Sequence, residues 1–197
     1  MRLVALTISY LLGSIPTAFL MVKWLKRIDV RTVGSGNVGA TNVTRAAGVG
    51  AGCVVFLLDA AKGWIAACLV APRLWHPLSP IAPLSCGLMA VIGHNFPVFL
   101  KFRGGKGVAT TIGVLLGTMP VVGAIFLAVL AGCLIIWRYV SLGALIAAVT
   151  LPCIQWAMHQ TFGELLLGLA LSLLIIVRHR ANIERLRQGK EHRLGSL

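Results

Sequence analysis

Long apolar stretches separated by short polar connections make up most of this chain. Six stretches stand out, at residues 3–22, 51–72, 80–100, 108–137, 141–158 and 162–177. A helix needs roughly 20 apolar residues to cross the hydrocarbon core of a bilayer. The pattern therefore predicts an all-α integral membrane protein in which residues 1–197 form a single transmembrane domain. The first stretch is long enough to be a retained helix rather than a signal peptide.

The fourth stretch decides the number of spans because its 30 residues contain the sequence Gly117-Thr-Met-Pro120. Proline lacks a backbone donor and clashes with the preceding turn, so a helix breaks there. The break would leave two helices of roughly 12 and 16 residues. At 1.5 Å per residue, both helices are shorter than the hydrocarbon core, which is about 30 Å thick. We still expect seven transmembrane helices, with some thinning or tilt to accommodate the short pair.

The distribution of charge supports seven spans. The chain carries 18 Lys and Arg against 5 Asp and Glu, and basic residues collect in cytoplasmic loops of membrane proteins. Seven spans with the N-terminus outside place 15 basic residues inside and 2 outside, whereas six spans give 8 against 9. We therefore expect a cytoplasmic C-terminus, and the basic excess reflects membrane topology rather than a nucleic-acid partner.

The first polar segment runs Gly34-Ser-Gly-Asn-Val-Gly-Ala-Thr-Asn-Val-Thr-Arg45. Its three glycines permit positive φ and close approach of the backbone, so successive N–H groups can surround an anion. The arginine adds a planar fork that matches phosphate. A flexible linker is the alternative, but a linker does not need Asn, Thr and Arg between its glycines. The segment matches the dinucleotide-binding pattern only by accident, because no strand precedes it, and it has Ala40 where a P-loop carries lysine.

The second polar segment is Gly104-Gly105-Lys106-Gly107, after His94-Asn-Phe-Pro-Val-Phe-Leu-Lys-Phe-Arg103. It opens a helix, and a helix N-terminus adds partial positive charge to a backbone that can bind an anion. A basic loop that only fixes topology is the alternative. Lys101 and Arg103 would suffice for that role, so we interpret Lys106 as functional.

The third polar segment follows the last apolar stretch and contains His179 and Asn182, which share one helix face. Neighbouring cations should lower the pKa of His179, and a neutral imidazole can accept a proton or position a hydroxyl. Asp59 and Lys62 lie three apart within the second span. We expect them to form a structural ion pair, although a transporter would also explain charges at that depth.

These three segments together resemble the signature regions of the bacterial acyl-phosphate:glycerol-3-phosphate acyltransferases, over nearly the whole chain. The resemblance implies seven spans, a site facing the cytoplasm of a bacterial inner membrane, and transfer of a fatty acyl group to the 1-hydroxyl of sn-glycerol 3-phosphate. The implied products are lysophosphatidic acid and inorganic phosphate. The implied catalytic residues are Ser35, Lys106, His179 and Asn182, and the implied phosphate-binding residues are Gly34, Gly36, Asn37, Gly39, Thr41, Arg45, Gly105 and Gly107.

The resemblance leaves the proton acceptor open between His179 and the leaving phosphate. A Ser35 nucleophile is not supported, because no Ser-His-Asp arrangement is apparent. We expect no cofactor and no metal, since the five carboxylates are scattered along the chain. The expected partners are acyl phosphate, glycerol 3-phosphate and membrane lipids, and the expected state is a monomer. A small anion or lipid transporter and a non-catalytic scaffold are the rival interpretations. A transporter predicts polar residues along the interiors of the spans, where Asp59 and Lys62 are nearly the only ones, and a scaffold does not need the glycine-rich segments.

Overall fold

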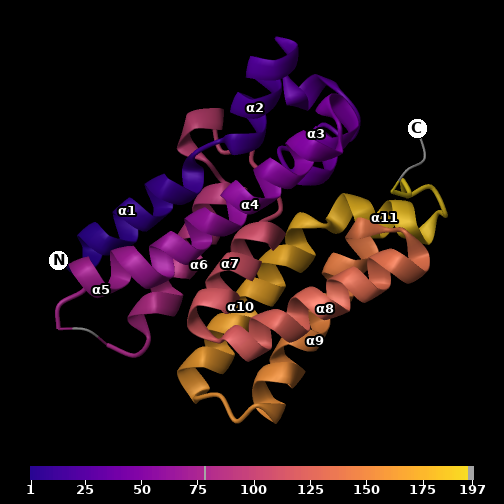
Figure 1. Ribbon diagram of the computed structural model, residues 1–197. Helices are drawn as coiled ribbons and strands as arrows, with labels where there is room; N and C mark the ends of the chain where they lie inside the picture. Colours follow the sequence, from indigo (N-terminus) through magenta and orange to yellow (C-terminus); the bar gives the residue numbers. More distant parts are fainter. Residues whose placement is uncertain (78, 195–197) are drawn as a thin grey trace.

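All regular secondary structure in the computed structural model, which describes residues 1–77 and 79–194, is helical (Figure 1). The α-helices are α1 (Arg2–Ser14), α2 (Thr17–Lys26), α3 (Ala40–Ala47), α4 (Val49–Ile65), α5 (Ala71–Leu74), α6 (Ala82–Asn95), α7 (Val108–Thr118), α8 (Pro120–Trp137), α9 (Val140–Ala157), α10 (Phe162–Arg178) and α11 (Arg180–Arg187). Shorter helical turns are η1 (Val30–Thr32), the π-helical η2 (Ala66–Val70) and η3 (Val98–Leu100).

Five helical segments in the described residues are long and apolar enough to cross a bilayer. They are Arg2–Lys26, Val49–Leu74, Ala82–Leu100, Pro120–Trp137 and Val140–Ala157. A sixth is formed by α10 and α11 if this pair, bent by 58°, counts as one broken span. Helix α7 has only 11 residues, about 16 Å at 1.5 Å per residue, and does not reach the usual length. The expected count of seven is thus reached only if α7 crosses a thinned region.

The predicted break in the fourth apolar stretch is confirmed. Helix α7 ends at Thr118 and α8 begins at Pro120, with Met119 between them. Proline is tolerated at the first position of a helix because the N–H that it lacks would have no partner there. The two helices have 11 and 18 residues, close to the expected division.

The first apolar stretch is interrupted in a way that the sequence reasoning did not predict. Helix α1 ends before Pro16, and the carbonyl of Ile15 accepts a hydrogen bond of 3.2 Å from the Lys62 ammonium. Lys62 also lies 2.8 Å from the carboxylate of Asp59, which accepts a 2.6 Å hydrogen bond from the Thr17 hydroxyl. The predicted ion pair is therefore confirmed. It satisfies polar groups at a break within the first span, which lipid cannot do.

The functional segments gather at one end of the helix bundle. Figure 1 shows α3 and α11 near each other at the end opposite α5 and the N-terminus. Between the ends, α1 and α6 pack closely through small residues: a Cβ on Gly13 would lie 2.1 Å from the Ala90 carbonyl oxygen, and one on Gly93 would lie 2.2 Å from that of Tyr10. Such contacts are typical of helix pairs in membranes.

Candidate active site

The segment from residue 34 to residue 45 forms a loop that leads into α3, and Asn42 holds it in shape. The side chain of Asn42 is buried; its amide donates to the carbonyls of Val30 and Val33, and its Oδ1 accepts from the Ser35 N–H at 3.0 Å. Gly34, at φ +55°, adopts a conformation that disfavours a side chain. Asn42 is thus a structural residue of the loop, whereas the loop side chains that precede it are available to a ligand.

The Gly104–Gly107 segment is fixed from two sides. The N–H groups of Gly104 and Gly105 donate to the carbonyls of Asn95 and His94 at the end of α6, at 3.2 and 3.0 Å. Their own carbonyls accept hydrogen bonds of 2.8 and 3.0 Å from the guanidinium of Arg178. These N–H groups are engaged within the protein, so the predicted role of Gly105 in binding phosphate stays a prediction. What the arrangement does is fix the backbone that carries Lys106.

Lys106 contacts α11, just beyond the end of α10, through Asn182. Its ammonium donates to Asn182 Oδ1 at 2.5 Å, and the Asn182 amide donates to Glu191 Oε1 at 2.9 Å. The other carboxylate oxygen of Glu191 accepts a 2.9 Å hydrogen bond from Arg185. Glu191 therefore orients the amide of Asn182 so that its oxygen faces Lys106. Sequence reasoning treated Glu191 as one of five scattered carboxylates and missed this role.

His179 lies between α10 and α11 with a defined tautomer. Its Nδ1 is 2.8 Å from the carbonyl oxygen of Ile175, and because a carbonyl only accepts, Nδ1 carries the proton. In the neutral ring Nε2 is then the atom free to accept. Burial, reinforced by the nearby charge of Lys106, lowers the pKa of His179 to about 4. The imidazole is neutral near pH 7, as the sequence predicts.

Burial also lowers the pKa of the Lys106 ammonium to about 8. Glu191 opposes this shift, and the charges of Arg185, Arg178 and Arg45 add to it. Lys106 is therefore still mainly cationic near neutral pH. A cation that is already partly desolvated, with a neutral amide as its hydrogen-bond partner, can interact strongly with an anionic ligand.

A cavity of about 130 Å³ brings most of the predicted residues together. Nine of the twelve line it: Ser35, Asn37, Gly39, Thr41, Arg45, Lys106, Gly107, His179 and Asn182. Gly36 lines a neighbouring open cleft instead, and Gly34 and Gly105 line neither. Apolar side chains complete the inner cavity, among them Phe56 of α4, Leu130 of α8 and Ala144 of α9. One cavity thus combines anion-binding groups with an apolar wall.

Several residues that sequence reasoning did not assign to a site also line this cavity. Asp59 and His94 belong to the buried ion-pair cluster, with His94 Nδ1 at 3.5 Å from Asp59 Oδ1. Ser141, at the start of α9, has a buried hydroxyl without a hydrogen-bond partner among the described residues. His192 follows Glu191 in the tail. Only the Asp59–Lys62 spacing gave a signal in the sequence, because the other residues come together solely through the fold.

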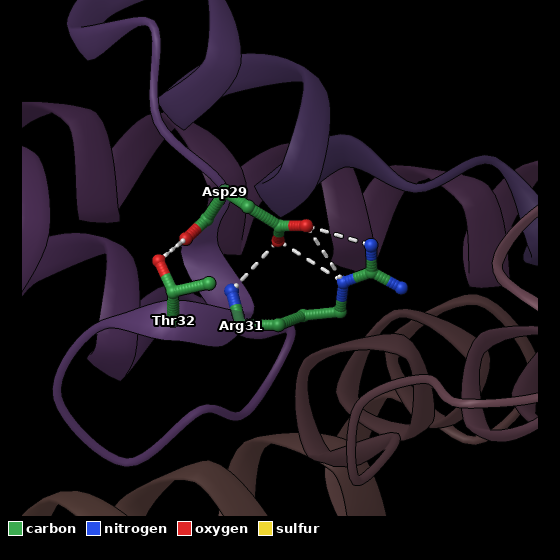
Figure 2. Close-up of polar contacts among 3 residues, drawn as sticks. All are labelled: Asp29, Arg31 and Thr32. Atoms are coloured by element: carbon green, nitrogen blue, oxygen red, sulfur yellow. Dashed lines mark hydrogen bonds and ion pairs between the residues drawn. The ribbon is translucent and has the colours of Figure 1, made fainter.

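The neighbouring cleft is open, has a volume of about 710 Å³ and shares Ser35, Asn37, Lys106 and Asn182 with the inner cavity. At its edge Asp29 holds the guanidinium of Arg31 through both carboxylate oxygens, with the shortest contact at 2.6 Å (Figure 2). This hydrogen-bonded pair lowers the pKa of Asp29. Across residues 1–77 and 79–194, no group of three or more His, Cys, Asp or Glu is arranged to hold a metal. The cations that line the cavity and the cleft, among them Arg45, Lys106 and Arg185, suit the site to anions.

Comparisons with known proteins agree with this chemistry. A family model described as glycerol-3-phosphate acyltransferase matches residues 3–189. A glycerol-3-phosphate acyltransferase from Synechococcus elongatus is 42% identical over 195 residues, covering 95% of this chain and 92% of the relative. Another from Thermoanaerobacter pseudethanolicus is 44% identical over 191 residues, covering 95% and 93% of the two chains.

Two crystal structures of PlsY, an integral membrane glycerol 3-phosphate acyltransferase, have a similar fold. The glycerol 3-phosphate form superposes with a TM-score of 0.91 at 42% identity, covering 98% of this chain and 96% of the other. The lysophosphatidic acid form gives a TM-score of 0.87 at 41% identity, covering 98% and 95%. The similarity extends over the helices and all three polar segments.

Proposed function

The chain belongs to the glycerol-3-phosphate acyltransferase family, and from that premise we propose that it transfers a fatty acyl group from acyl phosphate to the 1-hydroxyl of sn-glycerol 3-phosphate. The products are lysophosphatidic acid and inorganic phosphate. One observation carries the proposal: the inner cavity joins Arg45, Lys106 and Asn182 to apolar residues of α4, α8 and α9. An acyl phosphate needs both kinds of surface, because its head group is anionic and its chain is apolar.

Acyl phosphate suits this cavity better than a coenzyme A thioester. Acyltransferases that use coenzyme A carry a His-x4-Asp motif, and the nearest match here is His159 with Glu164. Glu164 caps α10 through Thr161, and neither His159 nor Glu164 lines the cavity. The cations around the cavity instead match a phosphate leaving group. Acyl phosphate is already an activated donor, so its reaction requires no covalent enzyme intermediate.

The positions of these residues around the cavity support the following roles. Lys106 and Arg45 hold phosphate oxygens, Ser35 and Thr41 offer hydroxyl donors, and these fixed donors stabilise the oxyanion that develops at the acyl carbon. The 1-hydroxyl oxygen attacks the acyl carbon, and the bond to the phosphate oxygen breaks, so that phosphate leaves with the electron pair.

The hydroxyl proton passes either to Nε2 of His179 or to the leaving phosphate. Nε2 is the ring nitrogen that the hydrogen bond of Nδ1 to Ile175 leaves free, which supports His179 as the group that orients the hydroxyl. Replacing His179 by Asn tests the choice. A rate that falls about 10²–10⁴-fold with an unchanged KM for glycerol 3-phosphate supports a base, whereas a small loss supports the phosphate.

The proposed topology has seven spans, an extracytoplasmic N-terminus and a cytoplasmic site in a bacterial inner membrane. The contact of Lys106 with Asn182 supports an even number of crossings between them, because a single crossing by residues 108–137 would put these two side chains on opposite sides of the membrane. Single cysteines in a cysteine-free background, at Arg138 and at His159, should be labelled from the cytoplasmic and the outer side, respectively; labelling of both from one side would contradict the topology.

Donor competition tests the proposed reaction. The purified protein in lipid vesicles is given glycerol 3-phosphate with either palmitoyl phosphate or palmitoyl-coenzyme A, and lysophosphatidic acid is quantified. The proposal predicts product only with the acyl phosphate. Equal product from the thioester would overturn the donor assignment but not the family. The monomeric state is checked separately by light scattering of the same preparation.

A further inference from the structure

The open cleft beside the inner cavity is strongly cationic. Its lining residues include five cations, Arg31, Arg103, Lys106, Arg178 and Arg185. Asp29 is the only carboxylate among the described residues that line it. Since Lys106 and Asn182 belong to both walls, the cleft leads directly into the cavity where the reaction is proposed to occur.

Three of these cations, Arg103, Lys106 and Arg178, form no ion pair with a carboxylate in the described part of the chain, whereas Arg31 and Arg185 are paired with Asp29 and Glu191. Arg178 donates to two backbone carbonyls and stacks on Phe96, with 5.1 Å from its guanidinium carbon to the ring centroid, so its full charge remains. Arg31 is fixed by Asp29 and by Phe19, 5.5 Å from its guanidinium carbon (Figure 2 shows the Asp29 contact). The side chain of Arg103 is exposed and makes no hydrogen bond or ion pair with the described part of the chain. A preorganised cationic surface with one unengaged arginine is suited to binding an anion.

The cationic surface of the cleft can reduce the electrostatic repulsion between the two substrates of the proposed reaction. Both substrates carry a phosphate, so an incoming acceptor meets a cavity whose cations already face the donor phosphate. The inner cavity, at about 130 Å³, is also less than a fifth of the volume of the cleft. Cations placed outside the cavity would offset the repulsion between the two phosphates and concentrate the acceptor at its mouth.

We propose that this cleft is a second phosphate subsite, in which Arg103, with Arg178 and Arg31, binds the phosphate of the water-soluble acceptor before it reaches Lys106. The ligand class is a small phosphate monoester dianion. The inference rests on the proposed function for the identity of the acceptor, but it concerns residues outside the reaction chemistry. It predicts an effect on capture of the acceptor rather than on the transfer step.

Charge reversal at Arg103 tests the subsite. Arg103→Glu should raise the KM for glycerol 3-phosphate about tenfold at low ionic strength, with kcat within twofold of wild type. The matched control is Lys101→Glu, an exposed residue two positions away that does not line the cleft. It should leave the KM within twofold. Arg31→Gln should give a smaller rise than Arg103→Glu, because Asp29 already offsets its charge.

Salt gives a second measurement that a folding defect would not reproduce. Exposed charges are screened beyond about 10 Å at 0.1 M ionic strength. Raising the salt from about 20 to 300 mM should therefore weaken acceptor capture in the wild type and in Lys101→Glu, and much less in Arg103→Glu. Equal KM values and salt slopes in all three proteins would overturn the subsite. If the wild-type protein showed no acyl transfer at all, that result would instead overturn the proposed function itself.

Discussion

Lys62 and Lys106 are both removed from bulk water, but their surroundings differ. Lys62 is almost fully buried in α4 and is matched by the Asp59 carboxylate and the Ile15 carbonyl. Lys106 stands in a fixed glycine loop, meets the neutral amide of Asn182, and faces both the cavity and the cleft. A charge whose partners are all within the protein stabilises the fold. A charge that has only a neutral partner and open space beside it is suited to bind a ligand.

The largest expected effect is on the stability of the fold, and it distinguishes Lys62 from Lys106. Lys62→Met leaves Asp59 buried without its ammonium partner, which typically costs about 3–5 kcal/mol. The thermal unfolding midpoint in detergent, followed by tryptophan fluorescence, should therefore drop sharply. The double variant Asp59→Asn with Lys62→Met should recover much of the loss, because it removes both charges. A single variant as stable as wild type would show that the pair has no structural role.

The second effect concerns activity. Lys106→Ala removes a preorganised cation from the reaction site and should lower the turnover number about 10²–10³-fold. Its unfolding midpoint should stay near that of wild type, since Lys106 has no charged partner to leave behind. Phosphate release and the unfolding midpoint are measured on the same preparation. Loss of stability without loss of turnover would reverse the roles assigned to the two lysines.

The pH dependence of kcat/KM tests the role assigned to Lys106. With the pKa of Lys106 lowered to about 8, the cation fraction falls about tenfold for each pH unit above that value. The wild-type kcat/KM should therefore decline about tenfold between pH 9 and pH 10. Lys106→Arg keeps its charge throughout this range and should lose the decline, even if its rate is lower. An identical alkaline decline in both proteins would assign it to another group.

The smallest effect is expected at the exposed pair of Asp29 and Arg31. Both side chains are partly open to solvent, and such pairs contribute no more than about 1 kcal/mol. Asp29→Asn should therefore leave the unfolding midpoint nearly unchanged, in contrast to Lys62→Met. A drop comparable to that of the buried variant would mean that the pair holds the loop before α3.

Much of the architecture could be predicted because membrane spans and breaks are local features of a sequence. The apolar stretches give the helices, and Pro120 gives the break between α7 and α8. Pro16 carries the same signal, yet the length of the first stretch alone predicts one helix, whereas the structure divides it into α1 and α2. Seven spans require α7, which has only 11 residues, to cross a thinned region of the bilayer.

The site was predictable where one segment contains several polar groups and not where the fold assembles them. Lys106, His179 and Asn182 were found because each lies in a dense polar segment. Glu191 was missed because its partners Asn182 and Arg185 reach it only after the tail folds back along α11. Asn42 lies in the same polar segment as Ser35 and Thr41, but the fold turns its amide to the carbonyls of Val30 and Val33.

The proposed function places transfer from acyl phosphate to glycerol 3-phosphate in the cavity around Lys106. Phosphate release by the purified protein, measured with and without the acceptor alongside quantified lysophosphatidic acid, tests it most directly. We expect acceptor-dependent release, one lysophosphatidic acid for each phosphate, and loss of both in Arg45→Ala. Release that is equal without the acceptor, or wild-type rates in Arg45→Ala, would contradict it.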